Sequence, residues 1–292
     1  MIVHGPVASP QHKAPTPARA RPDPAPRLGG QADADHAQAG VEMDIRHMLK
    51  LYHYWSSTCS RRVRITLAEK QIDWTSHHVD IHRKKEQLED WYKQINPNSY
   101  VPALDHDGRI LIESLVIMQY LDEVYDTGTS LVPDDAYRRG MMRIWMDRFE
   151  YAVHKAVNAL SHSRSHSDKF VGVSHDELKA LWMKVGNPEK RRILLHRLEY
   201  GVSEAEEASA IERIENVLDM MEAQLAQTPW LCGETLTLAD IAMAPYPERF
   251  EANKLDMLTD FSKRPHYGNW VAKIQSLSSY KEAYAFPNPD AA

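Results

Sequence analysis

The chain has 292 residues, of which 43% are hydrophobic and 26% charged, a balance typical of one large or two smaller globular domains. Its formal net charge of −6 argues against nucleic acid as the main partner, and the sequence lacks the run of 18 apolar residues that predicts a membrane-spanning helix. The two cysteines, Cys59 and Cys232, form neither a disulfide framework nor a metal-binding spacing, which fits a reducing cytoplasm.

The composition changes near residue 42. Residues 1–42 hold seven of the 17 prolines, whereas all the aromatic residues (7 Trp, 13 Tyr and 5 Phe) lie beyond them. A segment without aromatic side chains buries too little apolar surface to offset its ordering entropy, so residues 1–47 are predicted to be a disordered Pro/Ala-rich tail. The alternative is that translation starts at Met43 or Met48. In either case we expect a chain that begins at Met48 to keep full activity.

Residues 48–125 alternate between strand and helix patterns. The expected elements, in chain order, are strand 49–54, helix 61–70, strand 73–81, helix 86–95, a short apolar run at 101–104, strand 109–112 and helix 115–125. The first three have the size of one β-α-β crossover unit. The whole order predicts an α/β domain with a mixed four-stranded sheet.

Beyond a linker at 126–133, the chain shows only helical patterns. These lie at about 135–165, 175–185, 188–200, 204–227, 238–254 and 263–275. Residues 134–286 are therefore predicted to be an all-α domain.

A cluster of hydroxyl groups marks the junction of the first strand and first helix, in the stretch Y-W-S-S-T-C-S-R-R-V-R-I at 54–65. The N-terminus of a helix favours an anion, and a hydroxyl that donates to sulfur stabilises a thiolate. The cluster therefore indicates activation of a thiol that a cofactor brings. The alternative is a helix N-cap with no chemical role.

Two shorter motifs could bind the parts of such a cofactor that lie beyond its thiol. Val101-Pro102, next to a strand, can hold a cis bond that turns the Val101 backbone toward an extended peptide. Glu113-Ser114, at a helix start, offers an acceptor to an ammonium and donors to a carboxylate, as on a γ-glutamyl group. The alternatives are a plain proline at the start of a strand and simple helix capping.

Three further features favour a structural interpretation. Thr237-x-x-Asp240 is a capping box that starts a buried helix, and Cys232 is expected to be a small buried hydrophobe. His162 and His166 have the i, i+4 spacing of metal ligands, but no acidic third ligand lies nearby, so no metal is predicted.

Residues 49–285 resemble a glutathione transferase. The stretch S-S-T-C-S-R-R-V-R-I resembles the SSCxWRVRIAL signature of the zeta class (maleylacetoacetate isomerase), with Thr58 in place of the second Ser and Arg61 in place of the Trp. The resemblance implies a thioredoxin-like N-terminal domain and a helical C-terminal domain. It implies glutathione as cofactor and Ser57 as the catalytic hydroxyl, with Cys59 and Ser60 as the alternatives.

The same resemblance implies the remaining parts of the site. The glutathione-binding residues are Thr58, Gln87, Tyr100, Val101, Pro102, Glu113 and Ser114. The residues that contact an aromatic acceptor are Trp55, Trp145, Tyr151 and His154. The resemblance also implies a cytoplasmic homodimer that pairs through the helices at 113–125 and 137–150.

Other stretches resemble bacterial lignin β-etherases of the same superfamily: R-K-K-E-Q-L-E-D-W-Y-K-Q-I-N-P at 83–97, N-P-E-K-R-R at 187–192 and the W-L-C-G-E-T-L-T-L-A-D-I run. We therefore expect glutathione to attack a small hydrophobic, aromatic or aryl-ether electrophile. A zeta-type cis–trans isomerase is the second interpretation, but the long 161–203 segment counts against it. A non-catalytic binding module is the third, and the hydroxyl cluster counts against it.

Overall fold

A computed structural model of the chain describes residues 49–166 and 172–287. The predicted tail at 1–47 lies outside the described residues, and so does the side chain of His166.

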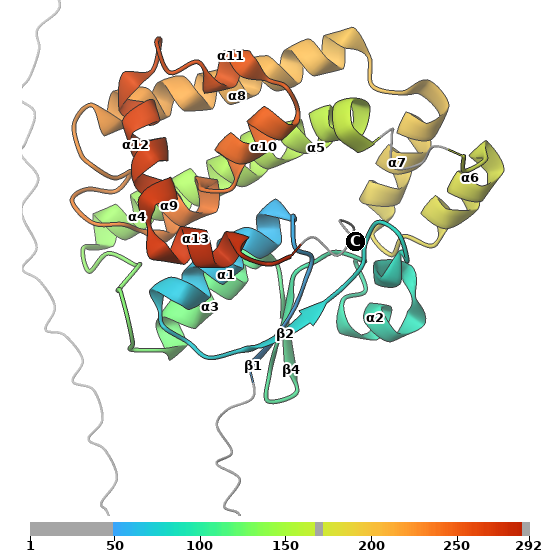
Figure 1. The fold of residues 1–292 in the computed structure, drawn as a ribbon, viewed down its shortest axis with the longest axis horizontal. Helices are drawn as coiled ribbons and strands as arrows, with labels where there is room; N and C mark the ends of the chain where they lie inside the picture. The colour runs from blue at the N-terminus through green and yellow to red at the C-terminus, as the bar shows by residue number, and fades with distance from the viewer. Residues whose placement is uncertain (1–48, 167–171, 288–292) are drawn as a thin grey trace, which may run out of the picture. The chain divides into compact units, whose positions relative to one another are not determined.

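The N-terminal part is built around one mixed sheet (Figure 1). Its elements are β1 (Leu49–His53), α1 (Thr58–Glu69), β2 (Thr75–His78), the 3-10 turn η1 (Glu86–Leu88), α2 (Asp90–Ile95), β3 (Ala103–His106), β4 (Arg109–Ile112) and α3 (Ser114–Val124). The strand order is β2-β1-β3-β4, with β1 and β2 parallel and the other two pairs antiparallel. This confirms the predicted four-stranded mixed sheet.

The remaining elements that the structure describes are helices, as predicted. The helices are α4 (Ala136–Arg148), the π-helical η2 (Phe149–His154), α5 (Lys155–Ser161), the π-helical η3 (His162–His166), α6 (His175–Met183), α7 (Pro188–Tyr200), α8 (Glu204–Leu225), α9 (Leu238–Met243), α10 (Tyr246–Ala252), α11 (Asp256–Thr259), α12 (Pro265–Ser276) and α13 (Ser278–Tyr284). The pattern expected at 238–254 forms two helices, because Pro245 and Pro247 remove two backbone donors at that point.

Helix α1 begins at Thr58, three residues before the predicted start, because Ser57 caps it. Its apolar residues Val63, Ile65 and Leu67 are fully buried, and α1 packs against α3. Arg61, which stands where the zeta signature has Trp, forms an ion pair with Glu248. Its guanidinium lies 4.0 Å from the ring centre of Tyr284. The departure from the signature is thus accommodated by contacts to α10 and α13.

The capping box at the start of α9 is a buried hydrogen-bonded junction. Asp240 is fully buried and accepts from the backbone N–H and the hydroxyl of Thr237. It also accepts from the N–H of Leu231 and the indole of Trp270. One carboxylate therefore joins the segment before α9 to α12, which is the structural role that the sequence predicts.

Helices α6 and α7 stand apart from the other helices and lie beside α2 (Figure 1). Trp182 and Val185 pack with Leu88 of η1 in a small apolar cluster of their own. The chain between the two helices meets the turn before β3 so closely that a Cβ added at Gly186 would lie 1.7 Å from the carbonyl oxygen of Pro97. Helices α6 and α7 are therefore docked on the thioredoxin-like part.

Candidate active site

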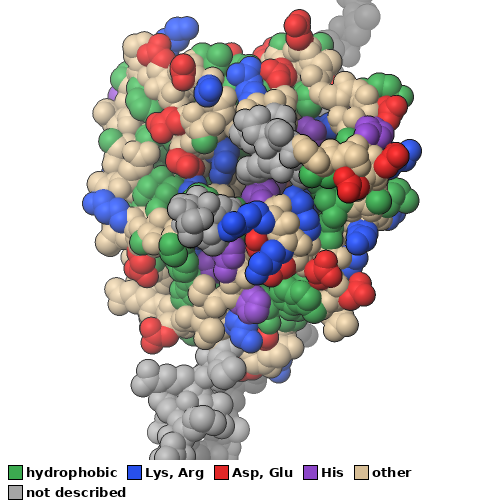
Figure 2. Space-filling view, turned by 45° about the vertical axis from the view of Figure 1, so that its right-hand side comes forward, with side chains coloured by type: hydrophobic (Ala, Val, Ile, Leu, Met, Phe, Trp, Pro, Cys, Tyr) green, Lys and Arg blue, Asp and Glu red, His purple; other side chains and the backbone are tan. Residues whose placement is uncertain are grey.

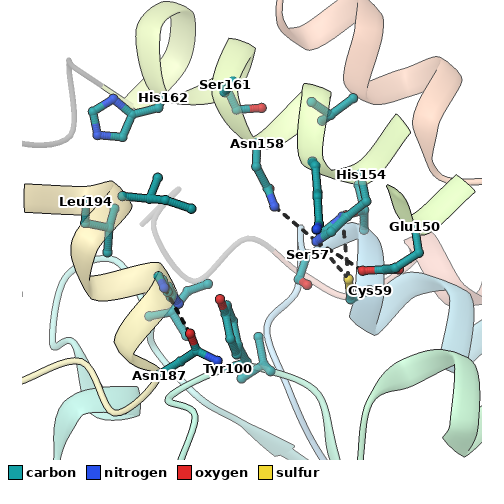
Figure 3. A pocket seen from close by; sticks show the side chains of 18 of the residues that line it. Ser57, Cys59, Tyr100, Glu150, His154, Asn158, Ser161, His162, Asn187 and Leu194 are labelled. Atoms are coloured by element: carbon teal, nitrogen blue, oxygen red, sulfur yellow. Dashed lines mark hydrogen bonds and ion pairs between the residues drawn. The ribbon is translucent and has the colours of Figure 1, made fainter. Parts of the chain in front are cut away.

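A cavity of about 930 Å³ is lined by the sheet domain on one side and by α5, α7 and α8 on the other (Figure 3). It is lined by every residue predicted to bind the cofactor: Thr58, Gln87, Tyr100, Val101, Pro102, Glu113 and Ser114. Ser57, Cys59 and His154 line it as well. Motifs separated by almost 100 positions in the sequence thus share one volume.

Ser57 is both a helix cap and a cavity residue. Its Oγ accepts from the backbone N–H of Ser60 at 3.2 Å. A hydroxyl that accepts still has its own hydrogen to donate. The two interpretations of the hydroxyl cluster are therefore compatible in this residue.

Cys59 lies in the first turn of α1, on the side that lines the cavity, between two basic groups. Its Sγ is 3.4 Å from Nη2 of Arg62 and 3.9 Å from each ring nitrogen of His154. Burial alone would raise the pKa of this thiol, but Arg62 and His154 outweigh it and lower the pKa to about 7. The two basic groups thus favour the thiolate form of Cys59.

A carboxylate completes this cluster. Glu150 accepts from Nη2 of Arg62 at 2.8 Å and lies 3.9 Å from Nε2 of His154. Burial opposes protonation of His154, yet the Cys59 sulfur and Glu150 raise its pKa above the ordinary value. His154 also contacts the hydroxyl of Tyr246 at 3.1 Å and the amide of Asn158 at 3.1 Å. The imidazole is therefore held on both sides and faces the thiol.

The edge beside Val101 is shaped to receive an extended chain. The Val101–Pro102 peptide is cis, as the motif suggested. The carbonyl of Tyr100 is held by the hydroxyl of Tyr92 at 2.5 Å and by the amide of Asn96 at 2.9 Å. Val101 itself makes no backbone hydrogen bond to any residue in the described part of the chain.

Glu113 and Ser114 stand at the start of α3, where the backbone of Glu113 is left-handed with φ 69°. Such backbone conformations in a non-glycine residue concentrate at ligand sites. The hydroxyl of Ser114 accepts from Nε of Arg62 at 2.9 Å, which links this corner to the Cys59 cluster.

Two polar atoms of the cavity wall are buried without a hydrogen-bond partner among the described residues. They are Nη1 of Arg62 and Oε1 of Gln87, a donor and an acceptor. Buried polar atoms are normally paired, so the wall fits a ligand that carries both kinds of group. A peptide with free carboxylates, such as glutathione, meets this requirement.

Four of the predicted site residues do not line the cavity. Ser60 is fully buried, and its Oγ accepts from the N–H of Tyr54 at 3.3 Å. It lies about 100° further round α1 than Cys59 and therefore points away from the cavity. Trp145 is buried in the core, where it stacks on Phe149. Tyr151 is 60% exposed on the outer side of its helix, and Trp55 also lies outside the cavity wall. The structure thus places these four side chains away from the cavity wall.

Other cavity residues were not predicted: Arg62, Glu150, Asn158 and Lys190. The spacing of Glu150, His154 and Asn158, four residues apart, could have indicated one helix face. Nothing in the sequence signals Lys190, because its place depends on how α7 docks.

Comparison with known proteins identifies the family. Residues 56–124 match the glutathione S-transferase N-terminal domain, and residues 190–273 match the glutathione S-transferase C-terminal domain. Protein LigF of Sphingobium sp. (strain NBRC 103272 / SYK-6) is 32% identical over 253 residues, which cover 81% of this chain and 93% of that protein. The chain belongs to the glutathione S-transferase family. This membership confirms glutathione as the cofactor that the sequence predicts.

Solved structures of the glutathione S-transferase family share the fold. The crystal structure of β-etherase LigF from Sphingobium sp. strain SYK-6 superposes with a TM-score of 0.76 at 26% identity, over 81% of this chain and 98% of that one. A maleyl pyruvate isomerase, a bacterial zeta-class enzyme, superposes with a TM-score of 0.62 at 28% identity, over 83% of this chain and 100% of that one.

Two other findings concern only the described residues. No helix among them is long and apolar enough to cross a membrane. They also contain no group of three or more His, Cys, Asp or Glu side chains placed to hold a metal ion.

Proposed function

We propose that this glutathione S-transferase activates the thiol of glutathione for attack on an electrophilic aromatic or aryl-ether acceptor. The observation that carries the proposal is the shared cavity: the Ser57 hydroxyl and the Cys59–Arg62–His154 cluster face the same volume as the free Val101 edge and the Glu113-Ser114 corner. The likeness to LigF supports an ether as acceptor.

The sheet domain would hold glutathione through three kinds of contact. Glu113 and Ser114 receive its γ-glutamyl end, the Val101 backbone pairs with its central residue, and Thr58, Gln87 and Tyr100 line its sides. When bound, glutathione supplies a sulfur nucleophile.

The residues of the chain stabilise negative charge at that sulfur. The Ser57 hydroxyl donates, the first turn of α1 contributes its positive end, and the Arg62 guanidinium adds a full charge. His154 lies beside Cys59 in the same cluster, and its raised pKa suits it to donate a proton to a departing oxygen.

The helical side of the cavity supplies the acceptor wall. Val157, Ile193 and Leu194 offer apolar surface, with Asn158 and Arg197 beside them. These apolar side chains form a strip within a largely polar wall, so an aromatic ring can pack on the strip while the polar groups beside it orient its oxygen atoms.

The function is tested by assaying the purified chain, with glutathione, on a β-aryl ether, an activated aryl halide and maleylacetoacetate side by side. We expect ether cleavage or aryl transfer, with glutathione consumed in proportion to product. Isomerisation of maleylacetoacetate without consumption of glutathione would instead establish the zeta-type function. Retention on glutathione-agarose without turnover of any of the three would establish a binding module.

A further inference from the structure

Helix α7 brings one ammonium group into the cavity. Nζ of Lys190 lies 3.7 Å from the ring centre of Tyr100 and 3.3 Å from the carbonyl oxygen of Ser99. Within the described part of the chain, no carboxylate lies within ion-pair distance of this ammonium. Figure 2, turned to bring the side of α6 and α7 forward, shows Lys, Arg and His side chains toward the middle of that face.

The partial burial of this ammonium makes an anion favourable beside it. Burial lowers the pKa of Lys190 to about 7, against the opposing pull of the Cys59 sulfur. The Tyr100 ring and one backbone carbonyl are weak partners for a full positive charge. A carboxylate ligand would provide the missing charge-assisted hydrogen bond.

The pairing of β3 with β4 sets the direction of a peptide bound at Val101. Ala103 pairs with Ile112, so the next position along the ladder brings Pro102 beside Glu113. Tyr100 therefore lies on the side of Val101 that is remote from Glu113. A tripeptide with its γ-glutamyl end at Glu113 and its centre at Val101 must extend its other end toward Tyr100.

We propose that Lys190 binds the carboxylate at the glycyl end of glutathione, so that a helix of the 161–203 segment completes a site otherwise built by the sheet domain. The inference rests on the glutathione site proposed above. What it adds is that α7 recognises the negative charge of the glycyl end through the side chain of Lys190.

A purely structural role for Lys190 is the competing explanation. The N–H of Gly186 donates to the hydroxyl of Ser99 at 3.3 Å, so Lys190 shares the Ser99 turn with another docking contact. If Lys190 only anchors α7, its loss weakens every ligand of the cavity to the same degree. If it binds the glycyl carboxylate, its loss weakens only ligands that carry that charge.

The experiment measures dissociation constants by calorimetry for glutathione and for its glycyl monoethyl ester, which lacks the charge. Wild type is compared with Lys190→Met, with Lys190→Arg, and with Arg192→Met, which removes the same charge from an exposed position of α7. We expect wild type and Arg192→Met to prefer glutathione to the ester by about ten-fold or more. Lys190→Met should lose this preference, and Lys190→Arg should retain most of it.

Two results would overturn the inference. One is an unchanged preference in Lys190→Met, and the other is an equal loss for glutathione and ester, which indicates anchoring alone. A wild-type chain that binds neither ligand would refute the glutathione site itself, and the role of Lys190 with it. Circular dichroism of each variant shows whether a lost affinity reflects lost folding.

Discussion

Ser57 combines two roles in one oxygen, and the two can be separated by substitution. Ser57→Ala removes both the helix cap and the hydroxyl donor, so we expect unfolding free energy to fall by about 1 kcal/mol. Turnover should fall by about 10²-fold, the usual cost of losing one donor to a developing anion. Urea denaturation and steady-state kinetics measure the two effects.

Ser57→Gly is the matched control, since glycine caps a helix almost as well as serine. It should lose the activity but keep nearly all of the stability. If Ser57→Ala keeps full turnover while Cys59→Ala abolishes it, the activating group is Cys59.

The environment of Cys59 predicts a pH profile for its alkylation. A thiol with a depressed pKa is thiolate above that pKa and loses reactivity as the pH falls through it. The rate with iodoacetamide should therefore be half-maximal near pH 7, and His154→Gln should move this midpoint toward the ordinary value of 9.0. Mass spectrometry of the labelled peptide gives the rate.

Cys232 serves as an internal control. It is buried, and burial raises the pKa of its thiol to about 11, so it should stay unlabelled in the folded protein. A wild-type midpoint near 9, or one that His154→Gln leaves in place, would show that the basic neighbours do not act on Cys59.

At the scale of single residues, the sequence predicts those site residues whose position depends only on their neighbours in the chain. Ser57, Val101-Pro102 and Glu113-Ser114 are set by a cap, a proline and a helix start, all visible within a few residues. The choice between Cys59 and Ser60 depends on about 100° of rotation around α1, which the motif does not contain. Glu150 and Lys190 enter the site only through the packing of distant helices.

At the scale of elements, the seam between α7 and the turn before β3 is set by Gly186. An added Cβ there would collide with the Pro97 carbonyl, a backbone atom that cannot move aside alone. We expect Gly186→Ala to displace α7 and weaken glutathione binding by about ten-fold, because the Lys190 contact is lost. Calorimetry measures the affinity, and hydrogen exchange over α7 reports the displacement.

Gly140 provides the comparison. A Cβ there meets nothing within 4 Å, and the residue lies inside α4. Gly140→Ala should leave binding unchanged and add up to about 1 kcal/mol of stability.

A double variant tests whether Gly186 acts through Lys190. Adding Lys190→Met to Gly186→Ala should weaken glutathione binding little further, since both changes remove the same contact. If the two losses of binding free energy add in full, Gly186 does not act through the Lys190 contact.

Element prediction succeeded where turn or capping residues bound the segment and failed where they do not. The strand at 109–112 and the helix at 188–200 have the predicted bounds. Helix α13, with the sequence SSYKEAY, was missed because seven mostly polar residues show no apolar period. Its two tyrosines, four residues apart on one helix face, stack with their ring centres 4.2 Å apart, a local spacing that the apolar pattern does not count.

At the scale of the whole molecule, we propose a homodimer that pairs through α3 and α4. Val116 of α3 and Ile144 of α4 are 49% and 48% exposed, and the same two helices also expose Val124 and Tyr137. Several exposed apolar side chains on both helices suit a contact surface. Val116→Asp combined with Ile144→Asp should therefore give a monomer in sedimentation velocity. Met183→Asp, at an equally exposed position of α6, should remain a dimer. A monomeric wild type would refute the proposal.

The π-helical turn at Phe149–His154 sets the angular phase of the longest helical stretch. A π turn holds one residue more than an α turn, and one residue corresponds to about 100° of rotation. Deleting Ala152 would restore a regular helix and leave Trp145 in the core, yet rotate His154 and Asn158 away from the thiol. The chemistry of this cavity thus depends on the number of residues in the Phe149–His154 turn as well as on their identity. Relatives with one residue more or fewer in this turn will present another face of the helix to the Cys59 position.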